Sequence, residues 1–174
     1  MKKIIFIFVI LFHINLVSQI TYNDKPFKKN NLNNIVKLMH SVRENDQKYR
    51  GQDYKNNLEK QNKLDSLNLS IIDSLYKKYN IYIGKSLVGE KLEHVMWLVI
   101  QHSNINKMEE YLPIIVNAVK NKELSIMTLV MLLDRIYAIK DGYQIFGSQM
   151  GVKLGDESIR EKVKFKYGLD KIGR

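Results

Sequence analysis

Residues 124–142 read LSIMTLVMLLDRIYAIKDG, a run in which apolar side chains point to nearly every side of a helix. A helix that is apolar all round is buried in a core, so this stretch predicts a central helix over about 124–140. Gly142 is the residue type that most readily adopts the left-handed conformation that ends a helix. An acid and a base, Asp134 and Arg135, stand near the end of the run. Polar groups in such a place need a partner in the fold or a ligand.

Four further segments show helical periodicity. Over about 31–50, apolar residues recur at steps of three and four. Over about 57–79 the expected apolar stripe consists of Leu58, Leu64, Leu67, Ile71, Leu75 and Tyr79. A third helix is expected over about 90–103, around the apolar centre VMWLVI. A fourth begins near Asn106, a suitable N-cap, with Pro113 kinking or restarting it.

These segments predict an all-α, or mainly α, fold: about five helices in an orthogonal or up-down bundle. The chain has only two prolines and nine glycines, a scarcity that favours long helices. The sequence NIYIGKSLVGE, residues 80–90, predicts a loop between the second and third helices. Residues 143–174 predict a short C-terminal hairpin or irregular tail, partly helical toward the chain end. Residues 31–174 are expected to form a single helical domain.

The N-terminal sequence MKKIIFIFVILFHINLVSQ predicts a signal peptide over residues 1–19. Lys2 and Lys3 precede a short apolar core, which His13 and Asn15 interrupt before it is long enough to span a bilayer comfortably. An uncleaved anchor is the alternative. Residues 20–30 are expected to form a flexible lead. The sequence therefore predicts an exported protein, periplasmic or secreted, with no stable membrane insertion after cleavage.

Composition restricts the function further. The formal charge is +10 at pH 7, but the lysines are scattered without interleaved aromatic residues, so nucleic acid is not an expected partner. The chain has no cysteine, which excludes disulfides and thiol chemistry. His94 and His102 are eight residues apart, which turns one well away from the other on a helix, and no HExxH motif occurs. Neither a metal site nor a cofactor is expected.

Alternation of helix direction would gather polar residues from distant parts of the chain. If consecutive helices are antiparallel, the C-terminal ends of the first, third and fifth predicted helices lie at one end of the bundle. One polar cluster beside the core is then expected. Its members are Asp46, Arg50, Gln101, His102, Asp134 and Arg135, with Gln144 and Gln149 emerging from the same end.

This cluster has a functional and a structural interpretation. As a catalytic pair, His102 would be a general base that Asp134 orients, while Arg50 and Arg135 would hold an anionic group. In the structural interpretation, the cluster only stabilises the end of the bundle: Asp46 would pair with Arg50, Asp134 would pair with an arginine, and His102 would cap helix carbonyls. The ligand-binding candidates are Asp46, Arg50, Gln101, Arg135, Gln144 and Gln149.

A series of short motifs in a fixed order adds a resemblance. They are DQKYR at 46–50, Asp65 with Asn68, GKSLVG at 84–89, WLVIQHSN at 97–104, YLPIIVNAVKNKE at 111–123, LLDRI at 132–136 and GYQIFGSQ at 142–149. Together they resemble a bacterial family catalogued as domain of unknown function 6624, over about residues 40–150. The resemblance implies candidate positions at the same polar cluster and implies no reaction.

The family forms Gln-His-Ala-Asp, Asp-Arg-Val and Tyr-Gly-Thr-Gln correspond here to residues 101–104, 134–136 and 146–149. Asn104 stands where the family has an acid, so a role that needs that carboxylate does not carry over. The sequence IYI, residues 81–83, replaces the Trp-Pro that usually precedes GKSLVG.

From the sequence we expect an exported helical protein that binds a small polar or anionic ligand at one end of the bundle. The first alternative is a metal-free hydrolase or transferase with His102 as general base. The second is a structural or protein-interaction module of the cell envelope, for which the sequence indicates no particular protein partner.

Overall fold

The computed structural model describes residues 29–51 and 53–171. The predicted signal peptide, 1–19, and residues 20–28 of the predicted lead lie outside the described residues. Residues 29 and 30 already belong to the first helix, which therefore begins slightly earlier than the sequence predicted.

The fold is mainly helical, as predicted. The α-helices are α1 (Lys29–Gln47), α2 (Leu58–Tyr79), α3 (Lys85–Val88), α4 (Val95–Gln101), α5 (Ile105–Lys120), α6 (Ile126–Asp141) and α7 (Glu157–Tyr167). Two short 3₁₀ segments, η1 (Tyr54–Asn57) and η2 (Leu169–Lys171), complete the described elements. Among the described residues, no helix is both long enough and apolar enough to cross a membrane.

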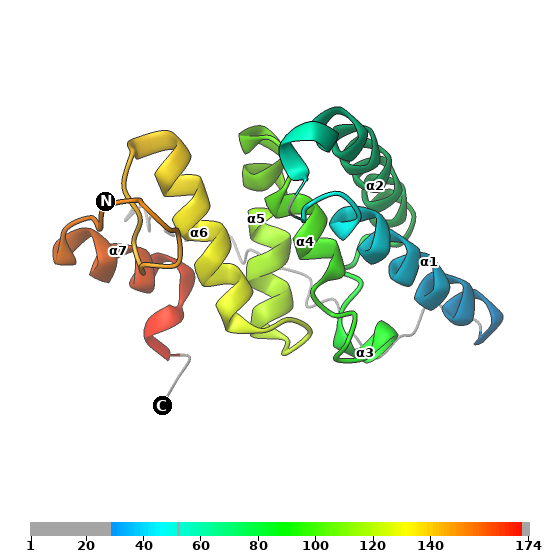
Figure 1. Cartoon of the computed structure of the whole chain (residues 1–174). Helices are drawn as coiled ribbons and strands as arrows, with labels where there is room; N and C mark the ends of the chain where they lie inside the picture. Colours follow the sequence, from blue (N-terminus) through cyan, green and yellow to red (C-terminus); the bar gives the residue numbers. More distant parts are fainter. Residues whose placement is uncertain (1–28, 52, 172–174) are drawn as a thin grey trace, which may run out of the picture.

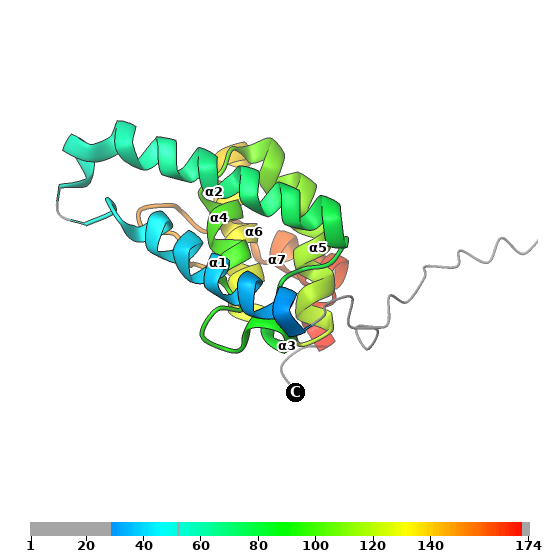
Figure 2. The ribbon, with the colours of Figure 1, turned by 90° about the vertical axis from the view of Figure 1, so that its right-hand side faces the viewer.

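Helix α4 lies at the centre of the bundle, as its apolar sequence predicted. It packs against α1, α2, α5 and α6, while α1 lies alongside α2, and α5 alongside α6 (Figures 1 and 2). Val95, Met96 and Ile100 are fully buried. The start of α2 lies beside the end of α1, and Lys140 near the end of α6 pairs with Glu109 near the start of α5. The pairs α1–α2 and α5–α6 are therefore antiparallel, in agreement with the expected alternation of helix direction.

Helix α2 turns a different face to the core from the one the sequence predicted. Its buried residues are Gln61, Asn68, Ile72 and Leu75. Leu58 and Leu67, assigned to the apolar stripe, are about half exposed (45% and 50%). Positions 61, 68, 72 and 75 share one helix face, but its first half is polar. The predicted stripe is therefore correct at Leu75, which is buried, and at Ile71 and Tyr79, which pack against the core, and wrong at Leu58 and Leu67.

The segment GKSLVG forms a short helix where a loop was expected. The Glu123 carboxylate accepts a hydrogen bond from the backbone N–H of Ser86 at 2.8 Å, and the Glu123 carbonyl accepts one from Lys85 N at 2.9 Å. Both bonds satisfy backbone donors at the start of α3, which have no partner within the helix. Gly84 permits this approach, because a Cβ there would lie 2.6 Å from the Glu123 carbonyl oxygen.

Helix α5 begins at a different cap and is not interrupted at its proline. Asn104, rather than Asn106, is the N-cap, and its side chain accepts a hydrogen bond from Lys107 N at 3.1 Å. Pro113 lies inside one continuous helix. Of the two expected effects of Pro113, a kink or a restart of the helix, the restart is therefore wrong.

The chain after α6 follows the irregular alternative rather than the hairpin. Helix α6 ends at Gly142, which has a φ of 73°, so this prediction is confirmed. Gln144 N donates to the Lys153 carbonyl and Gly155 N donates to the Gln144 carbonyl, which close a loop around one isolated bridge. A Cβ on Gly155 would lie 2.6 Å from the Tyr143 ring, so glycine is required there. Helix α7 then supplies the helical part of the tail.

Candidate functional site

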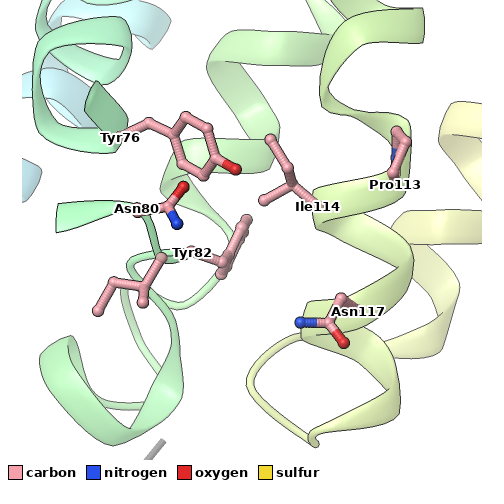
Figure 3. Close-up of a pocket in the computed structure, with 7 residues that line it drawn as sticks. Tyr76, Asn80, Tyr82, Pro113, Ile114 and Asn117 are labelled. Atoms are coloured by element: carbon pink, nitrogen blue, oxygen red, sulfur yellow. The ribbon is translucent and has the colours of Figure 1, made fainter. Parts of the chain in front are cut away.

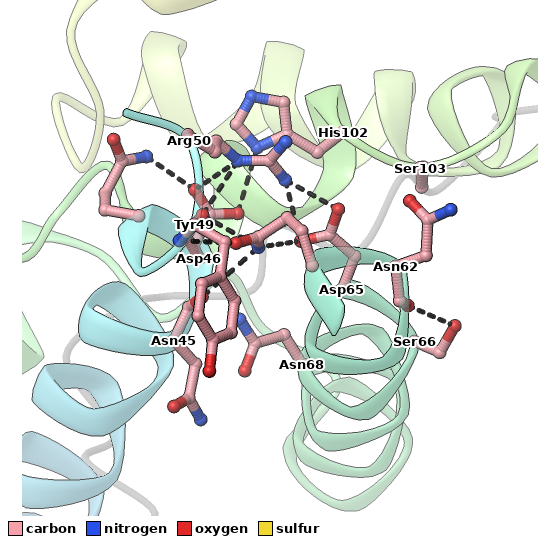
Figure 4. Close-up of polar contacts among 12 residues, drawn as sticks. Asn45, Asp46, Tyr49, Arg50, Asn62, Asp65, Ser66, Asn68, His102 and Ser103 are labelled. Carbon is pink, nitrogen blue, oxygen red and sulfur yellow. Dashed lines mark hydrogen bonds and ion pairs between the residues drawn. The ribbon is translucent and has the colours of Figure 1, made fainter. Parts of the chain in front are cut away.

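The C-terminal ends of α1 and α4 meet through one acid and one histidine. Oδ1 of Asp46 lies 2.9 Å from Nδ1 of His102 (Figure 4). The other carboxylate oxygen, Oδ2, accepts a hydrogen bond from the Gln47 side-chain amide at 2.6 Å. The side chain of Asp46 is 1% exposed, whereas that of His102 is 17% exposed. A buried carboxylate thus fixes the orientation of a ring that solvent can reach.

Arg50 connects this pair to α2. Its Nη2 lies 2.7 Å from both carboxylate oxygens of Asp65, and its Nε donates to the Asp46 carbonyl oxygen at 2.7 Å. The Arg50 Nε also lies 3.6 Å from Oδ2 of Asp46. The guanidinium therefore bridges two acids from two helices, and both ion pairs are largely shielded from water.

Gln61 completes the network from the inner face of α2. Its side-chain nitrogen donates to the Asp46 carbonyl at 3.0 Å and to Asp65 Oδ1 at 2.7 Å, and its oxygen accepts from Tyr49 N at 2.9 Å. Asn68, two turns further along, donates to the Val42 carbonyl at 3.0 Å. The amides on α2 thus donate to backbone carbonyls near the end of α1, and one of them, that of Asp46, lies in the last turn, where carbonyls lack an intrahelical partner. We call Asp46, Arg50, Gln61, Asp65 and His102 the Asp46 cluster.

A recess of about 220 Å³ lies beside this cluster, between α2 and the turn that joins α4 to α5. Among the described residues, Nε2 of His102 has no hydrogen-bond partner, and it is not one of the buried unpaired atoms, so solvent can reach it. In Figure 4 this second ring nitrogen points away from Asp46. We call the hollow the His102 recess; its lining residues are Asn62, Asp65, Ser66, Leu69, Val99, His102, Ser103 and Asn104.

Gln101 and Arg135 meet at the end of α4. Nη1 of Arg135 donates to the Gln101 backbone carbonyl at 3.2 Å, and Gln101 is 6% exposed. Oε1 of Gln101 and Nε of Arg135 are buried without a hydrogen-bond partner in the described residues. Burial, and then the positive charge of Arg50, lower the pKa of Arg135.

Asp134 has a structural position and does not orient His102. Its Oδ1 accepts hydrogen bonds from Ile145 N and Phe146 N, and its Oδ2 accepts one from Ser148 N, each at 2.7 Å. The residue is fully buried. The expected His102–Asp134 pair is therefore corrected: Asp46 is the carboxylate on His102, and Asp134 holds the loop after α6.

Gln144 and Gln149 also serve that loop. The Gln144 side chain donates to the carbonyls of Gln149 and Val152 and accepts from Gln149 N. The Gln149 side chain donates to the Met131 carbonyl at 3.4 Å and to Ser148 Oγ at 3.2 Å. None of these bonds reaches the Asp46 cluster, so the structure divides the predicted polar end into two separate networks.

Sequence reasoning left Gln61, Asp65 and Asn68 out of the candidate set. Asp65 and Asn68 lie one turn apart, a spacing that fits an exposed face as well as a site. The signal that identifies them is the position of all three on the face of Ile72 and Leu75. This spacing identifies them only if the core-facing side of α2 is allowed to be polar in its first half.

A second recess, of about 210 Å³, lies between the end of α2, the link that follows it and α5 (Figure 3). Tyr76, Tyr82 and Pro113 contribute rings to its wall, and Asn80 and Asn117 contribute amides. The predicted site residues do not line it. No three His, Asp or Glu side chains in the described part of the chain are grouped so that they could hold a metal ion.

No protein-family model, curated protein or solved structure matches this chain. The resemblance to the family of unknown function therefore stays a prediction from the motifs. The candidate site stands on its geometry alone.

Proposed function

We propose that the protein binds a small polar ligand in the His102 recess. The observation that supports this most is the Asp46–His102 pair, in which a buried carboxylate holds one ring nitrogen while the other stays open to solvent. A histidine that only capped a helix would have no need of an orienting acid. Such an acid fixes which nitrogen carries the proton and which way the ring faces.

The lining of the recess indicates a ligand rich in hydroxyl or amide groups. Two serine hydroxyls, two asparagine amides and an imidazole surround it, and only Leu69 and Val99 are apolar. Asp65 lines it too, but both its oxygens are already held by Arg50. Ligand recognition would therefore depend on directional hydrogen bonds from His102, Asn62 and Asn104.

The test is a thermal-shift screen of the purified protein against sugars, amino acids and short carboxylic acids. At least one compound should raise the melting temperature, and His102→Gln should weaken its binding about tenfold, since a lost hydrogen bond corresponds to about that factor. His40→Gln, which changes an exposed histidine on α1, is the matched control. Equal responses of wild type and His102→Gln to every compound would refute the proposal.

The same pair favours a second candidate, a metal-free hydrolase or transferase. Nε2 of His102 would take a proton from a water molecule as its oxygen attacks a carbonyl or phosphoryl centre. The proton would then pass to the leaving group. A positioned general base contributes about 10²- to 10⁴-fold to a rate. Hydrolysis of p-nitrophenyl acetate and p-nitrophenyl phosphate, lost in both His102→Gln and Asp46→Asn, would favour this candidate over simple binding.

Export to the periplasm or medium is part of the proposal and is supported by the sequence of residues 1–19 alone. Fusion of residues 1–25 to an alkaline phosphatase reporter would test it, because that reporter is active only after export. A fusion that leaves the reporter inactive would contradict this part without affecting the ligand site.

A further inference from the structure

Arg135 is a half-buried cation that forms no ion pair with any acid in the described part of the chain. Its guanidinium donates a hydrogen bond to the backbone carbonyl of Gln101 at 3.2 Å, and no carboxylate of the described residues lies within ion-pair distance. A buried charge normally has a partner of opposite sign, because removing it from water is costly. The fold supplies only a carbonyl at the C-terminal end of α4, which is a partial negative charge.

Asp46 and Asp65, the acids of the neighbouring cluster, already pair with other side chains. Arg50 holds Asp65 with one nitrogen and approaches Asp46 with another, and His102 takes the remaining oxygen of Asp46. The charge that acts on Arg135 is that of Arg50, which has the same sign and lowers the pKa of Arg135 together with burial. The sequence suggested that both arginines hold an anionic group, but in the structure the guanidinium of Arg50 is already paired with Asp46 and Asp65.

Two unsatisfied groups accompany this charge. Oε1 of Gln101 is buried and lacks a donor, on a residue that is 6% exposed. Nη2 of Arg135 has no hydrogen-bond partner in the described part of the chain and is not among the buried unpaired atoms, so solvent can reach it. The end of α4 thus has a cationic donor that solvent can reach and a buried acceptor that lacks a partner.

We propose that Arg135 binds an oxyanion, the carboxylate or phosphate of a small ligand, at the end of α4, with Arg50 contributing attraction without contact. The inference rests on the proposed function, since it assigns the charge of the ligand that reaches the His102 recess. Gln101 directly precedes His102 in the chain, but neither Gln101 nor Arg135 lines the His102 recess, so the ligand would have to extend beyond the recess to reach Arg135.

The experiment is isothermal titration of the purified protein with inorganic phosphate and, separately, with acetate, at constant ionic strength maintained with chloride. Saturable binding of at least one anion is expected, and the two arms distinguish phosphate from carboxylate. Arg135→Gln should weaken it about tenfold or more, because a charge-assisted hydrogen bond is among the strong ones. Arg135→Lys keeps the charge and should lose less. Arg43→Gln removes the same charge from an exposed position on α1 and should change the affinity less than about twofold.

Four results would overturn the inference that Arg135 binds an anion, and each can be told apart from a failure of the proposed function. Absence of saturable binding by both anions overturns the inference, and so does equal weakening by Arg43→Gln and Arg135→Gln, which would indicate only long-range attraction. If Arg135→Gln does not fold, Arg135→Lys decides, since unchanged affinity in that variant refutes a role for the guanidinium. A screened ligand that His102→Gln no longer binds, but that Arg135→Gln binds normally, would refute the anion inference and leave the proposed function standing.

Discussion

Arg50 and Asp65 form the ion pair that joins the first two helices, with one guanidinium nitrogen 2.7 Å from both carboxylate oxygens. The side chains are 18% and 19% exposed, so the pair is far better shielded from water than most ion pairs on a protein surface. Gln61 and the Asp46 carbonyl hold the two partners from either side. The network should therefore contribute measurably to stability, unlike a typical exposed pair.

A double-mutant cycle of Arg50→Ala and Asp65→Ala measures that contribution. We expect a coupling free energy of about 1–3 kcal/mol, the range for hydrogen bonds to charged groups that are partly removed from water. The measurement is the free energy of unfolding in urea for the wild type, both single variants and the double variant.

The matched control is the pair of Glu59 and Lys63 on the same helix, which is 2.8 Å long but 85% and 75% exposed. Its cycle should give a coupling close to zero, because water and salt screen it. Equal couplings for the two pairs would mean that burial does not strengthen the Arg50–Asp65 pair.

Asp134→Asn should loosen the loop after α6. An amide offers one oxygen, whereas the carboxylate accepts three backbone N–H groups, so at least one buried donor loses its partner. The expected loss of stability is about 1–3 kcal/mol. Hydrogen exchange should accelerate most at the amides of Ile145, Phe146 and Ser148. Unchanged exchange at these amides, in a folded variant, would contradict the structural role assigned to Asp134.

Gly84→Ala should be strongly destabilising, because the new methyl group would lie 2.6–2.8 Å from three atoms of Glu123, one of them a backbone oxygen. Separating these segments would also weaken the two hydrogen bonds that Glu123 makes to the start of α3. A loss of about 1–3 kcal/mol is expected, as for other overpacked sites. Gly51→Ala is the control: a Cβ there has nothing within 4 Å, so that variant should be nearly neutral. Similar unfolding midpoints for the two variants would be the contrary result.

The sequence predicted a structural feature correctly where a single residue determines it. Gly142 ends α6 because glycine tolerates the left-handed conformation without strain. The apolar run before it is buried only in part: Leu129, Leu132, Leu133 and Ile136 are buried, whereas Met127 and Ile139 are more than half exposed. The approach of the helix ends that carry Asp46 and His102 followed from the expected alternation of helix direction, although the sequence analysis paired His102 with Asp134.

The sequence did not predict how each helix is rotated about its own axis. Asp134 and Arg135 are adjacent, so they point about 100° apart on α6, and only one of them can face α4. Packing of the whole bundle turns Arg135 toward Gln101 and Asp134 toward the loop. On α2, the polar inner face of Gln61 and Asn68 is stabilised by carbonyls of α1. Those carbonyls belong to a different segment, so no periodicity within α2 reveals them.

Acid should destabilise the fold partly through His94, which precedes α4. Burial is the larger cause that lowers the pKa of His94 below its ordinary value of 6.5, and the charge of Arg43 is the second, while Glu93 opposes them. The folded state then binds a proton less readily than the unfolded chain does. Stability is fully present above pH 6.5 and is lost as the pH decreases toward the lower pKa of the folded state.

His94→Gln should therefore reduce the loss of stability between about pH 7 and pH 5, since the substituted residue does not titrate in that range. The free energy of unfolding, measured by urea denaturation at half-unit steps of pH, gives the slope for each protein. His40→Gln, on the exposed face of α1, should leave the slope close to that of the wild type. Should His94→Gln lose stability in acid as steeply as the wild type, another group that titrates in this range must bind the proton that drives unfolding.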